Sequence, residues 1–164
     1  MDCVKALDFL ETLPFIDQDR LFVRGTSQGG ALGMAVSALD RRVKLALVNV
    51  PSNSNIEYRV EHRHGSFASV NDYLRRYPDN LERVYETLSY FDTMNMAERI
   101  TAKVFASVGL ADPVCPALCY YATYNRIRSE KHICVYPFNE HDGARDTHIE
   151  RELAFVRESG LLTD

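Results

Sequence analysis

Residues 21–39 read LFVRGTSQGGALGMAVSAL, an apolar run that passes through a glycine-rich turn into a second apolar run. The first run predicts a β-strand and the second predicts a helix. Ser27 lies on the turn between them and forms a Gly-x-Ser-x-Gly pattern with Gly25 and Gly29. A strand-turn-helix of this kind holds its serine in a strained, exposed position above the sheet. Ser27 is therefore the candidate nucleophile.

The residues around Ser27 also have expected roles. Gly25 and Gly29 lack side chains that would collide with the neighbouring strand or helix where the chain reverses. The backbone N–H of Gln28 starts the helix and points toward negative charge that develops on a reacting oxygen. Gln28 is therefore the candidate main-chain donor of an oxyanion hole. The alternative interpretation is a glycine-rich turn with an ordinary serine.

Composition limits the class of protein. The 164 residues suit one domain, and 46% hydrophobic with 26% charged residues are ordinary for a globular chain. A net charge of -4 with scattered Lys and Arg argues against a nucleic-acid partner. No apolar run reaches the about 18 residues that span a bilayer, and charged residues interrupt the N-terminal apolar positions. We therefore expect a cytoplasmic protein with no membrane partner.

Neither the cysteines nor the histidines suggest a metal site. The four cysteines form no Cys-x-x-Cys pair, and they lie at positions 3, 115, 119 and 134. We expect reduced, mostly buried thiols. His62 and His64 form a His-x-His pair, but residues two apart on a helix point in different directions. The sequence predicts no metal and no organic cofactor.

The order of apolar and polar segments predicts an α/β fold. Strands are expected at 21–25, 44–50, 104–110 and 132–138, and helices at 2–13, 28–40, 116–128 and 146–158. Residues from about 56 to 100 are charged, aromatic and helical in pattern, and we expect a helical insertion there. Alternating strands and helices favour a mainly parallel sheet of about four strands with helices on both faces. The whole chain, 1–164, is expected to form a single domain.

Ser27, Asp112 and His141 each follow a predicted strand, at the carboxyl end where reactive groups of parallel sheets gather. A serine hydroxyl needs a base to take its proton, and that base needs a third group to fix its tautomer. The sequence therefore predicts a catalytic triad in which His141 is the base and Asp112 is the orienting acid. The chain order Ser, Asp, His is typical of α/β-hydrolases.

Other residues compete for these roles. His148 falls inside the last helix and His132 begins a strand, so neither is preferred as the base. Asp142 and Asp146 could replace the predicted acid, but both are close to the histidine loop and neither follows a strand of its own. Glu140 is expected to serve the loop or a solvated face.

Several segments carry a resemblance to a known family. They are Asp19-Arg20, Gly25 to Gly30, Leu88 to Asp92, Asn95 to Ile100, Gly109 to Asp112, Cys115-Pro116, Ala122 with Tyr124-Asn125, and the His141 loop. Through them nearly the whole chain resembles the C-terminal half of acetyl xylan esterases and cephalosporin-C deacetylases, which have the α/β-hydrolase fold. The segment Tyr90-Phe91-Asp92 is the most discriminating. The resemblance implies that Ser27, Asp112 and His141 are nucleophile, acid and base, with Gln28 as an oxyanion-hole donor.

The same resemblance implies a function, and this chain differs from the family in two respects. The implied function is a serine carboxylesterase that deacetylates carbohydrates or similar small acetyl esters through an acyl-enzyme. Full-length family members have a further N-terminal half that supplies the second oxyanion donor, so we expect a truncated domain. Losing one such donor typically costs about 10²–10³ in turnover. Asp142-Gly143 also stands where the family is expected to have Glu-Tyr.

The expected truncation leaves one side of the strand at 21–25 without a partner. We therefore expect the chain to form a homo-oligomer or to associate with the missing N-terminal half. Two other functions stay open at this point. One is a serine peptidase of the prolyl-oligopeptidase type, which shares the Gly-x-Ser-x-Gly-Gly turn. The other is a non-catalytic remnant or assembly module that lacks a complete oxyanion hole.

Overall fold

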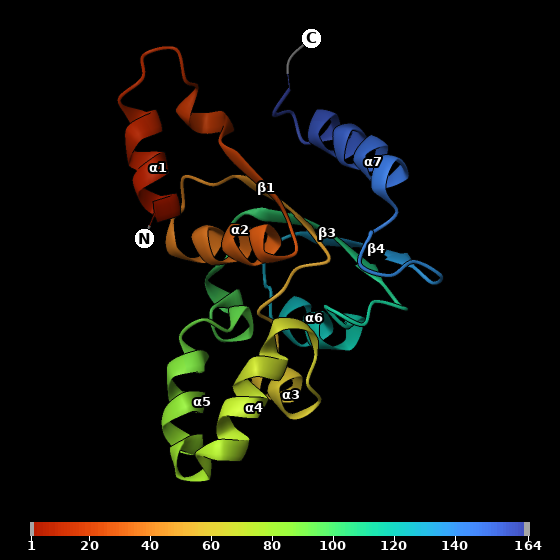
Figure 1. The fold of residues 1–164 in the computed structure, drawn as a ribbon. Coiled ribbons are helices and arrows are strands. Elements are labelled where there is room, and N and C mark those ends of the chain that lie inside the picture. Colours follow the sequence, from red (N-terminus) through yellow and green to blue (C-terminus); the bar gives the residue numbers. More distant parts are fainter. Residues whose placement is uncertain (1, 163–164) are drawn as a thin grey trace.

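The computed structural model describes residues 2–162, and these contain a four-stranded parallel sheet with strand order β1-β2-β3-β4. The strands are β1 (Phe22–Thr26), β2 (Leu45–Asn49), β3 (Lys103–Gly109) and β4 (Lys131–Tyr136). All four predicted strands are present, with slightly different bounds. The prediction of a mainly parallel sheet of about four strands is confirmed (Figure 1).

Helices precede the first strand, connect the strands and follow the last of them (Figure 1). They are α1 (Asp2–Glu11), α2 (Gln28–Leu39), α3 (Ile56–Glu61), α4 (Ala68–Arg76), α5 (Leu81–Ser89), α6 (Ala117–Tyr124) and α7 (Arg145–Glu158). Short 3₁₀ turns lie at Gln18–Arg20, Gly65–Phe67, Pro78–Asn80, Thr93–Asn95 and Ala97–Arg99. The helical character predicted for 56–100 thus appears as α3 to α5 and their turns.

Helix α6 ends earlier than predicted. The sequence predicts a helix to about Arg128, whereas α6 ends at Tyr124. The backbone N–H groups of Arg126 and Ile127 bond the carbonyls three residues before them, at 3.0 and 3.2 Å. The Lys131 ammonium donates to the carbonyls of Tyr124 and Ile127 at 2.7 and 2.8 Å. The chain therefore leaves the α-helix through a tighter 3₁₀-type turn. The Lys131 side chain of β4 satisfies carbonyls that no helical N–H group reaches.

The two faces of the sheet are covered by different helices. On one face α1, α2 and α6 pack against the apolar residues of the central strands, among them Met34, Ala46, Val48, Val104, Ala106 and Tyr120. On the other face α7 packs through Val156 against Leu45, Leu47 and Phe105. Every residue of β2 is buried, as expected of a strand covered on both sides. The predicted placement of helices on both faces is confirmed.

Asp92 closes the helical segment between β2 and β3. Its carboxylate accepts the backbone N–H groups of Asn55, Ile56 and Met94 at 3.1, 2.7 and 2.9 Å. Burial raises the pKa of Asp92, and the three N–H groups oppose that rise. The carboxylate thus ties the end of the segment to its beginning. Tyr90 and Phe91, its neighbours in the discriminating segment, are exposed.

Among residues 2–162, no helix combines the length and the apolar character needed to cross a membrane. The four cysteines are free thiols, with Cys115 and Cys119 buried and Cys3 and Cys134 partly buried.

Candidate active site

Ser27 joins β1 to α2 in a backbone conformation that is rare for a residue with a side chain. Its φ is 58° and its ψ is -116°. The Ser27 N–H donates to the carbonyl of Asn49 at 2.8 Å. The Ser27 carbonyl accepts the N–H groups of Ala31 and Ser52, each at 3.0 Å. The turn is thus fixed by α2 and by the segment that leaves β2.

The two glycines that flank Ser27 behave differently. A Cβ at Gly25 would lie 2.2 Å from the carbonyl oxygen of Gly29, so only glycine fits there. A Cβ at Gly29 would meet no heavy atom within 4 Å among residues 2–162. The predicted collision at Gly29 is therefore wrong. Gly29 faces a groove along the edge of β1 instead of a neighbouring element.

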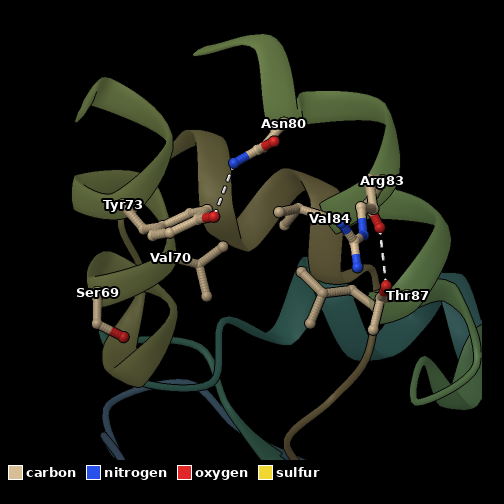
Figure 2. Close-up of a pocket in the computed structure, with 8 residues that line it drawn as sticks. Ser69, Val70, Tyr73, Asn80, Arg83, Val84 and Thr87 are labelled. Carbon is tan, nitrogen blue, oxygen red and sulfur yellow. Dashed lines mark hydrogen bonds between the residues drawn. The ribbon is translucent and has the colours of Figure 1, made fainter. Parts of the chain in front are cut away.

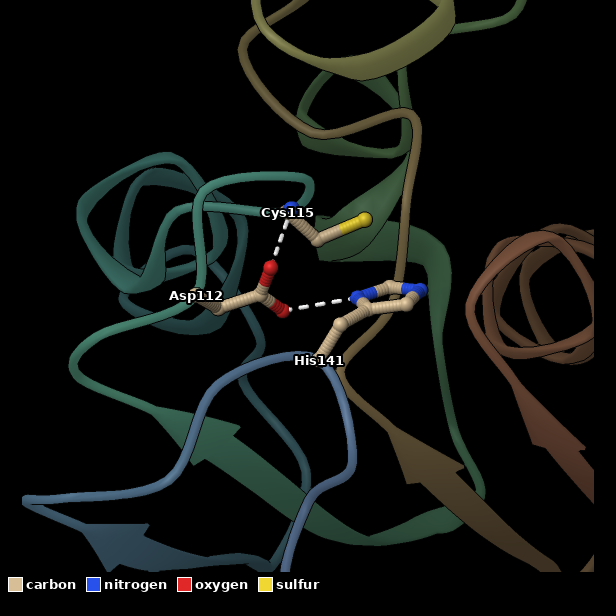
Figure 3. A group of neighbouring side chains, drawn as sticks. All are labelled: Asp112, Cys115 and His141. Atoms are coloured by element: carbon tan, nitrogen blue, oxygen red, sulfur yellow. Dashed lines mark hydrogen bonds and ion pairs between the residues drawn. The ribbon is translucent and has the colours of Figure 1, made fainter.

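The structure brings the three predicted triad residues together. The Nε2 atom of His141 lies 2.9 Å from the Oγ of Ser27, and its Nδ1 lies 2.8 Å from Oδ2 of Asp112. Figure 3 shows the Asp112 carboxylate against the imidazole. The Asp112 side chain is fully buried, whereas the His141 side chain is 31% exposed. The acid is thus shielded from water while the imidazole is open to it.

Asp112 is held by its own loop after β3. Its Oδ1 accepts the backbone N–H groups of Val114 and Cys115 at 2.8 and 2.9 Å, which leaves Oδ2 for the imidazole. A Cβ at Gly109 would lie 2.3 Å from the carbonyl oxygen of Glu140. Glycine at this position lets the end of β3 touch the loop that carries His141. The acid and the base are therefore brought together through backbone contacts.

This arrangement suits proton transfer from a hydroxyl. With its proton on Nδ1, the imidazole donates to Asp112 and presents the lone pair of Nε2 to the Ser27 hydroxyl. Gln28 is the first residue of α2. First-turn N–H groups have no acceptor within their helix, so the Gln28 N–H is suited to an external oxyanion.

The competing residues lie elsewhere or have other partners. Asp142 accepts the Asn139 side-chain amide at 2.9 Å and the Glu140 N–H at 3.0 Å, and these bonds lower the pKa of Asp142. Asp142 therefore stabilises the loop that carries His141. Glu140, Asp146 and His132 are exposed.

The position of Cys115 next to the acid is not predicted from the sequence. Its thiol is buried beside Asp112 and interacts with the Ser27 side chain. Arg59, itself buried, donates from Nη2 to the Val114 carbonyl at 2.7 Å and to the Cys115 sulfur at 3.7 Å. Burial raises the pKa of the Cys115 thiol, and the Arg59 charge opposes that rise. Cys115 follows Asp112 by three residues, but that spacing alone does not predict where its sulfur points.

A buried polar network lies under the His141 loop. Glu152 of α7 accepts Arg24 Nε at 2.8 Å and Asn49 Nδ2 at 2.7 Å, which ties α7 to β1 and β2. The Nδ1 of His148 lies 2.9 Å from the Tyr136 hydroxyl, and its Nε2 lies 3.8 Å from Glu152. Burial lowers the pKa of His148, although the Glu152 charge opposes that effect. His148 is therefore a structural histidine, remote from Ser27 in its contacts.

A separate groove of about 520 Å³ lies between α4 and α5 (Figure 2). Asn80 donates to the Tyr73 hydroxyl at 2.7 Å, and the Thr87 hydroxyl donates to the Arg83 carbonyl at 2.8 Å. None of the three predicted triad residues lines this groove. The candidate active site is therefore the Ser27 turn and its neighbours.

Comparison with known proteins identifies related chains. The family model described as acetyl xylan esterase (AXE1) matches residues 1–159. The acetyl esterase Axe7A of Xylanibacter ruminicola is 35% identical over 151 residues, which cover 92% of this chain and 34% of that protein.

Two solved structures are also similar. The acetyl xylan esterase from Paenibacillus sp. R4 superposes with a TM-score of 0.91 at 38% identity, covering 96% of this chain and 51% of that one. Acetyl xylan esterase 1 from Thermoanaerobacterium sp. JW/SL YS485 gives a TM-score of 0.87 at 33% identity, with coverage of 99% and 52%. This chain thus spans about half the length of these solved relatives. Several solved peptidases share the fold at 21% identity or less, and likeness at that level shows the fold alone.

The lowered pKa of His148 predicts a pH-dependent stability. The unfolded chain takes up a proton near the ordinary histidine pKa of about 6.5, whereas folded His148 resists it. This contribution is fully present above that pH and is lost as the pH falls below it. The wild type should therefore lose more of its unfolding free energy than His148→Asn between pH 7.5 and 5.5, measured by urea denaturation.

The matched control is Ile149→Ala, the exposed neighbour on α7, which should follow the pH dependence of the wild type. A constant gap between the wild type and His148→Asn across this range would contradict the assignment.

Proposed function

The chain belongs to the acetyl xylan esterase (AXE1) family, and from that membership we propose that it is a serine carboxylesterase acting on small acetylated substrates. The proposed substrates are acetylated carbohydrates or similar small acetyl esters. The observation that carries the proposal is the continuous hydrogen-bonded path from Ser27 through His141 to Asp112, with contacts of 2.9 and 2.8 Å. The cytoplasmic location expected from the sequence stays a prediction.

In the proposed reaction the Ser27 oxygen attacks the ester carbonyl carbon while Nε2 of His141 takes the hydroxyl proton. Asp112 stabilises the imidazolium, and the Gln28 N–H donates to the oxyanion. His141 then gives its proton to the leaving alcohol, and the acetyl group stays on Ser27. Water attacks this acyl-enzyme, His141 takes the water proton, and acetate leaves as the proton returns to Ser27. No step requires a metal or an organic cofactor.

The two alternatives predict different behaviour. A peptidase of the prolyl-oligopeptidase type would cleave peptide anilides faster than acetylated sugars. A non-catalytic assembly module would leave Ser27 unreactive toward a fluorophosphonate probe, because an unactivated hydroxyl is a poor nucleophile. The family match favours the esterase over both.

We also propose that another polypeptide covers the free edge of β1. In the sheet of residues 2–162, β1 pairs with β2 alone. A groove of about 370 Å³ runs along this edge, and Phe22 and Leu32 beside it are 42% and 51% exposed. An uncovered edge strand with apolar flanks favours association. The proposed occupants are a second copy of the chain or a segment equivalent to the other half of the relatives.

Substitution of Ser27 by Ala should abolish turnover of p-nitrophenyl acetate, with a loss of at least about 10³-fold, because the acyl-enzyme can no longer form. The same variant should lose labelling by a fluorophosphonate probe. Ser66→Ala, on an exposed 3₁₀ turn, is the control and should keep both. Equal rates in Ser27→Ala and the unmutated chain would end the esterase proposal.

Substitution of Asp112 by Asn should lower kcat by about 10³–10⁴-fold with little change in KM, because an amide donor on Nδ1 favours the wrong imidazole tautomer. The amide oxygen of the introduced asparagine can still accept the loop N–H groups that Asp112 now accepts, so the fold should persist by circular dichroism. Asp146→Asn in the first turn of α7 is the exposed control. A variant at Asp112 with near-normal kcat would show that His141 needs no partner.

Light scattering should give a mass above the 18.7 kDa of a single chain as concentration rises. Leu32→Asp at the β1 groove should reduce this association, because it removes apolar area from the contact and burying a carboxylate there costs free energy. Leu39→Asp, on the same helix but outside the groove, should not. A well-behaved monomer at high concentration would contradict self-association and favour the second occupant.

A further inference from the structure

Three side chains of different chemistry gather at the base and acid of the proposed triad. They are Asp112, Cys115 and His141, and one ligand atom of each lies within 4.8 Å of the others (Figure 3). A carboxylate oxygen, a thiol sulfur and an imidazole nitrogen are three of the groups that bind Zn²⁺ in proteins. The proposed hydrolysis uses the acid and the base but has no need of the thiol.

The spacing is close to that of a zinc site. Zinc bonds are about 2.3 Å to sulfur, about 2.0–2.1 Å to nitrogen and about 2.0–2.2 Å to oxygen. In a tetrahedral site these lengths place the ligand atoms about 3.3–3.8 Å apart. Atoms at the 4.8 Å limit of the present cluster therefore need to approach by about 1 Å. Nδ1 of His141 and Oδ2 of Asp112, now 2.8 Å apart, need to separate if both bind the ion.

The two sides of the cluster differ in how they are held. The Cys115 N–H donates to Oδ1 of Asp112 at 2.9 Å, so these two ligands share one rigid loop. His141 lies on the loop after β4, and its side chain is 31% exposed. An ion from solvent can thus approach on the imidazole side, and rotation of the imidazole can adjust its distances to the other two ligands.

We propose that Asp112, Cys115 and His141 form an inhibitory Zn²⁺ site. The role in inhibition rests on the proposed esterase function, whereas metal binding itself does not. Binding forms a bond to the carboxylate, to the thiolate sulfur and to one imidazole nitrogen, and the thiol proton passes to solvent. Water or the Ser27 hydroxyl takes the fourth position. The lone pair on the bound nitrogen is then no longer free for a proton.

Either imidazole nitrogen gives the same outcome. A metal on Nε2 replaces the 2.9 Å contact with Ser27, and a metal on Nδ1 replaces the 2.8 Å contact with Asp112. Both break the path for the serine proton. Because Zn²⁺ binding and proton transfer compete for one side chain, zinc acts as an inhibitor here.

The ligand set also determines which cations bind. Two anionic ligands offset the repulsion from Arg59, whose Nη2 lies 3.7 Å from the sulfur. Zinc and cobalt accept sulfur and nitrogen ligands, while Mg²⁺ and Ca²⁺ require oxygen ligands in larger number. The site is therefore expected to bind Zn²⁺ and Co²⁺ but not Mg²⁺.

The test uses Co²⁺ as a spectroscopic substitute for Zn²⁺, titrated into the purified full chain under reducing conditions. A bound thiolate gives a near-ultraviolet sulfur-to-cobalt charge-transfer band. We expect this band at one cobalt per chain, its loss on adding Zn²⁺, and its absence in Cys115→Ser. Ser27→Ala should keep the band, because the serine is not a required ligand. Cys134→Ser, a partly buried thiol on β4, is the matched control and should also keep it.

Inhibition is measured separately, with p-nitrophenyl acetate. The zinc concentration for half-inhibition should rise at least about 10-fold in Cys115→Ser, relative to that variant's own activity without metal, since even an outer partner of a metal site is worth about 10–100-fold. Mg²⁺ should not inhibit.

The outcomes separate the two proposals. A cobalt band that survives in Cys115→Ser, or no band in the wild type, overturns the site whether or not the chain hydrolyses esters. A band that requires Cys115 in a chain without esterase activity supports the site and refutes the proposed function. If Cys115→Ser misfolds by circular dichroism, Cys115→Ala, which introduces no hydroxyl into this buried position, takes its place in the cobalt titration. A charge-transfer band that survives in Cys115→Ala then overturns the site.

Discussion

The backbone of Ser27 is the constraint on which the candidate site depends. A left-handed φ costs a residue with a side chain about 1–3 kcal/mol, and it persists only where the surroundings enforce it. Here three backbone hydrogen bonds do so: the Ser27 N–H donates to Asn49, and the Ser27 carbonyl accepts from Ala31 and Ser52. Gly25 makes them compatible, because any Cβ there would displace the Gly29 carbonyl. The position of the hydroxyl is therefore set by main-chain geometry.

Main-chain contacts also fix the position of Asp112, whereas the side chain of His141 is the least restrained of the three. Asp112 is fixed by two N–H groups of its own loop, and Gly109 lets that loop touch the chain before His141. His141 is partly exposed, and the residues after it turn through positive φ at Gly143 and Ala144. A rigid acid with a more accessible imidazole suits a group that must exchange protons with substrate and water. It also leaves that imidazole open to competing ligands.

Local patterns explain how much of this could be predicted from the sequence. Apolar runs predict the four strands, and the glycine-rich turn and the chain order predict the three residues that the structure brings together.

Contacts that form only when the chain folds could not be predicted from these local patterns. Cys115 was expected to be an ordinary buried thiol, because no spacing rule says that the Asp112 turn folds the sulfur back toward Ser27. His148 was expected to be an ordinary helical residue, because its burial depends on Tyr136 and Glu152 meeting across β4 and α7. The collision predicted for a side chain at Gly29 is absent, because the surroundings of Gly29 depend on what lies beside β1.

The edge strand β1 leads directly into the turn that carries Ser27. The strand order β1-β2-β3-β4 puts the loops of Asp112 and His141 on one side of Ser27, and the free edge of β1 on the other. Gln28 begins α2 at this junction, and Gly29 lines the groove beside it. A polypeptide that pairs with β1 would therefore bury the groove beside the first turn of α2. Because the resemblance places the second oxyanion donor in the N-terminal half of family members, covering this edge and completing an oxyanion hole are proposed to depend on the same polypeptide.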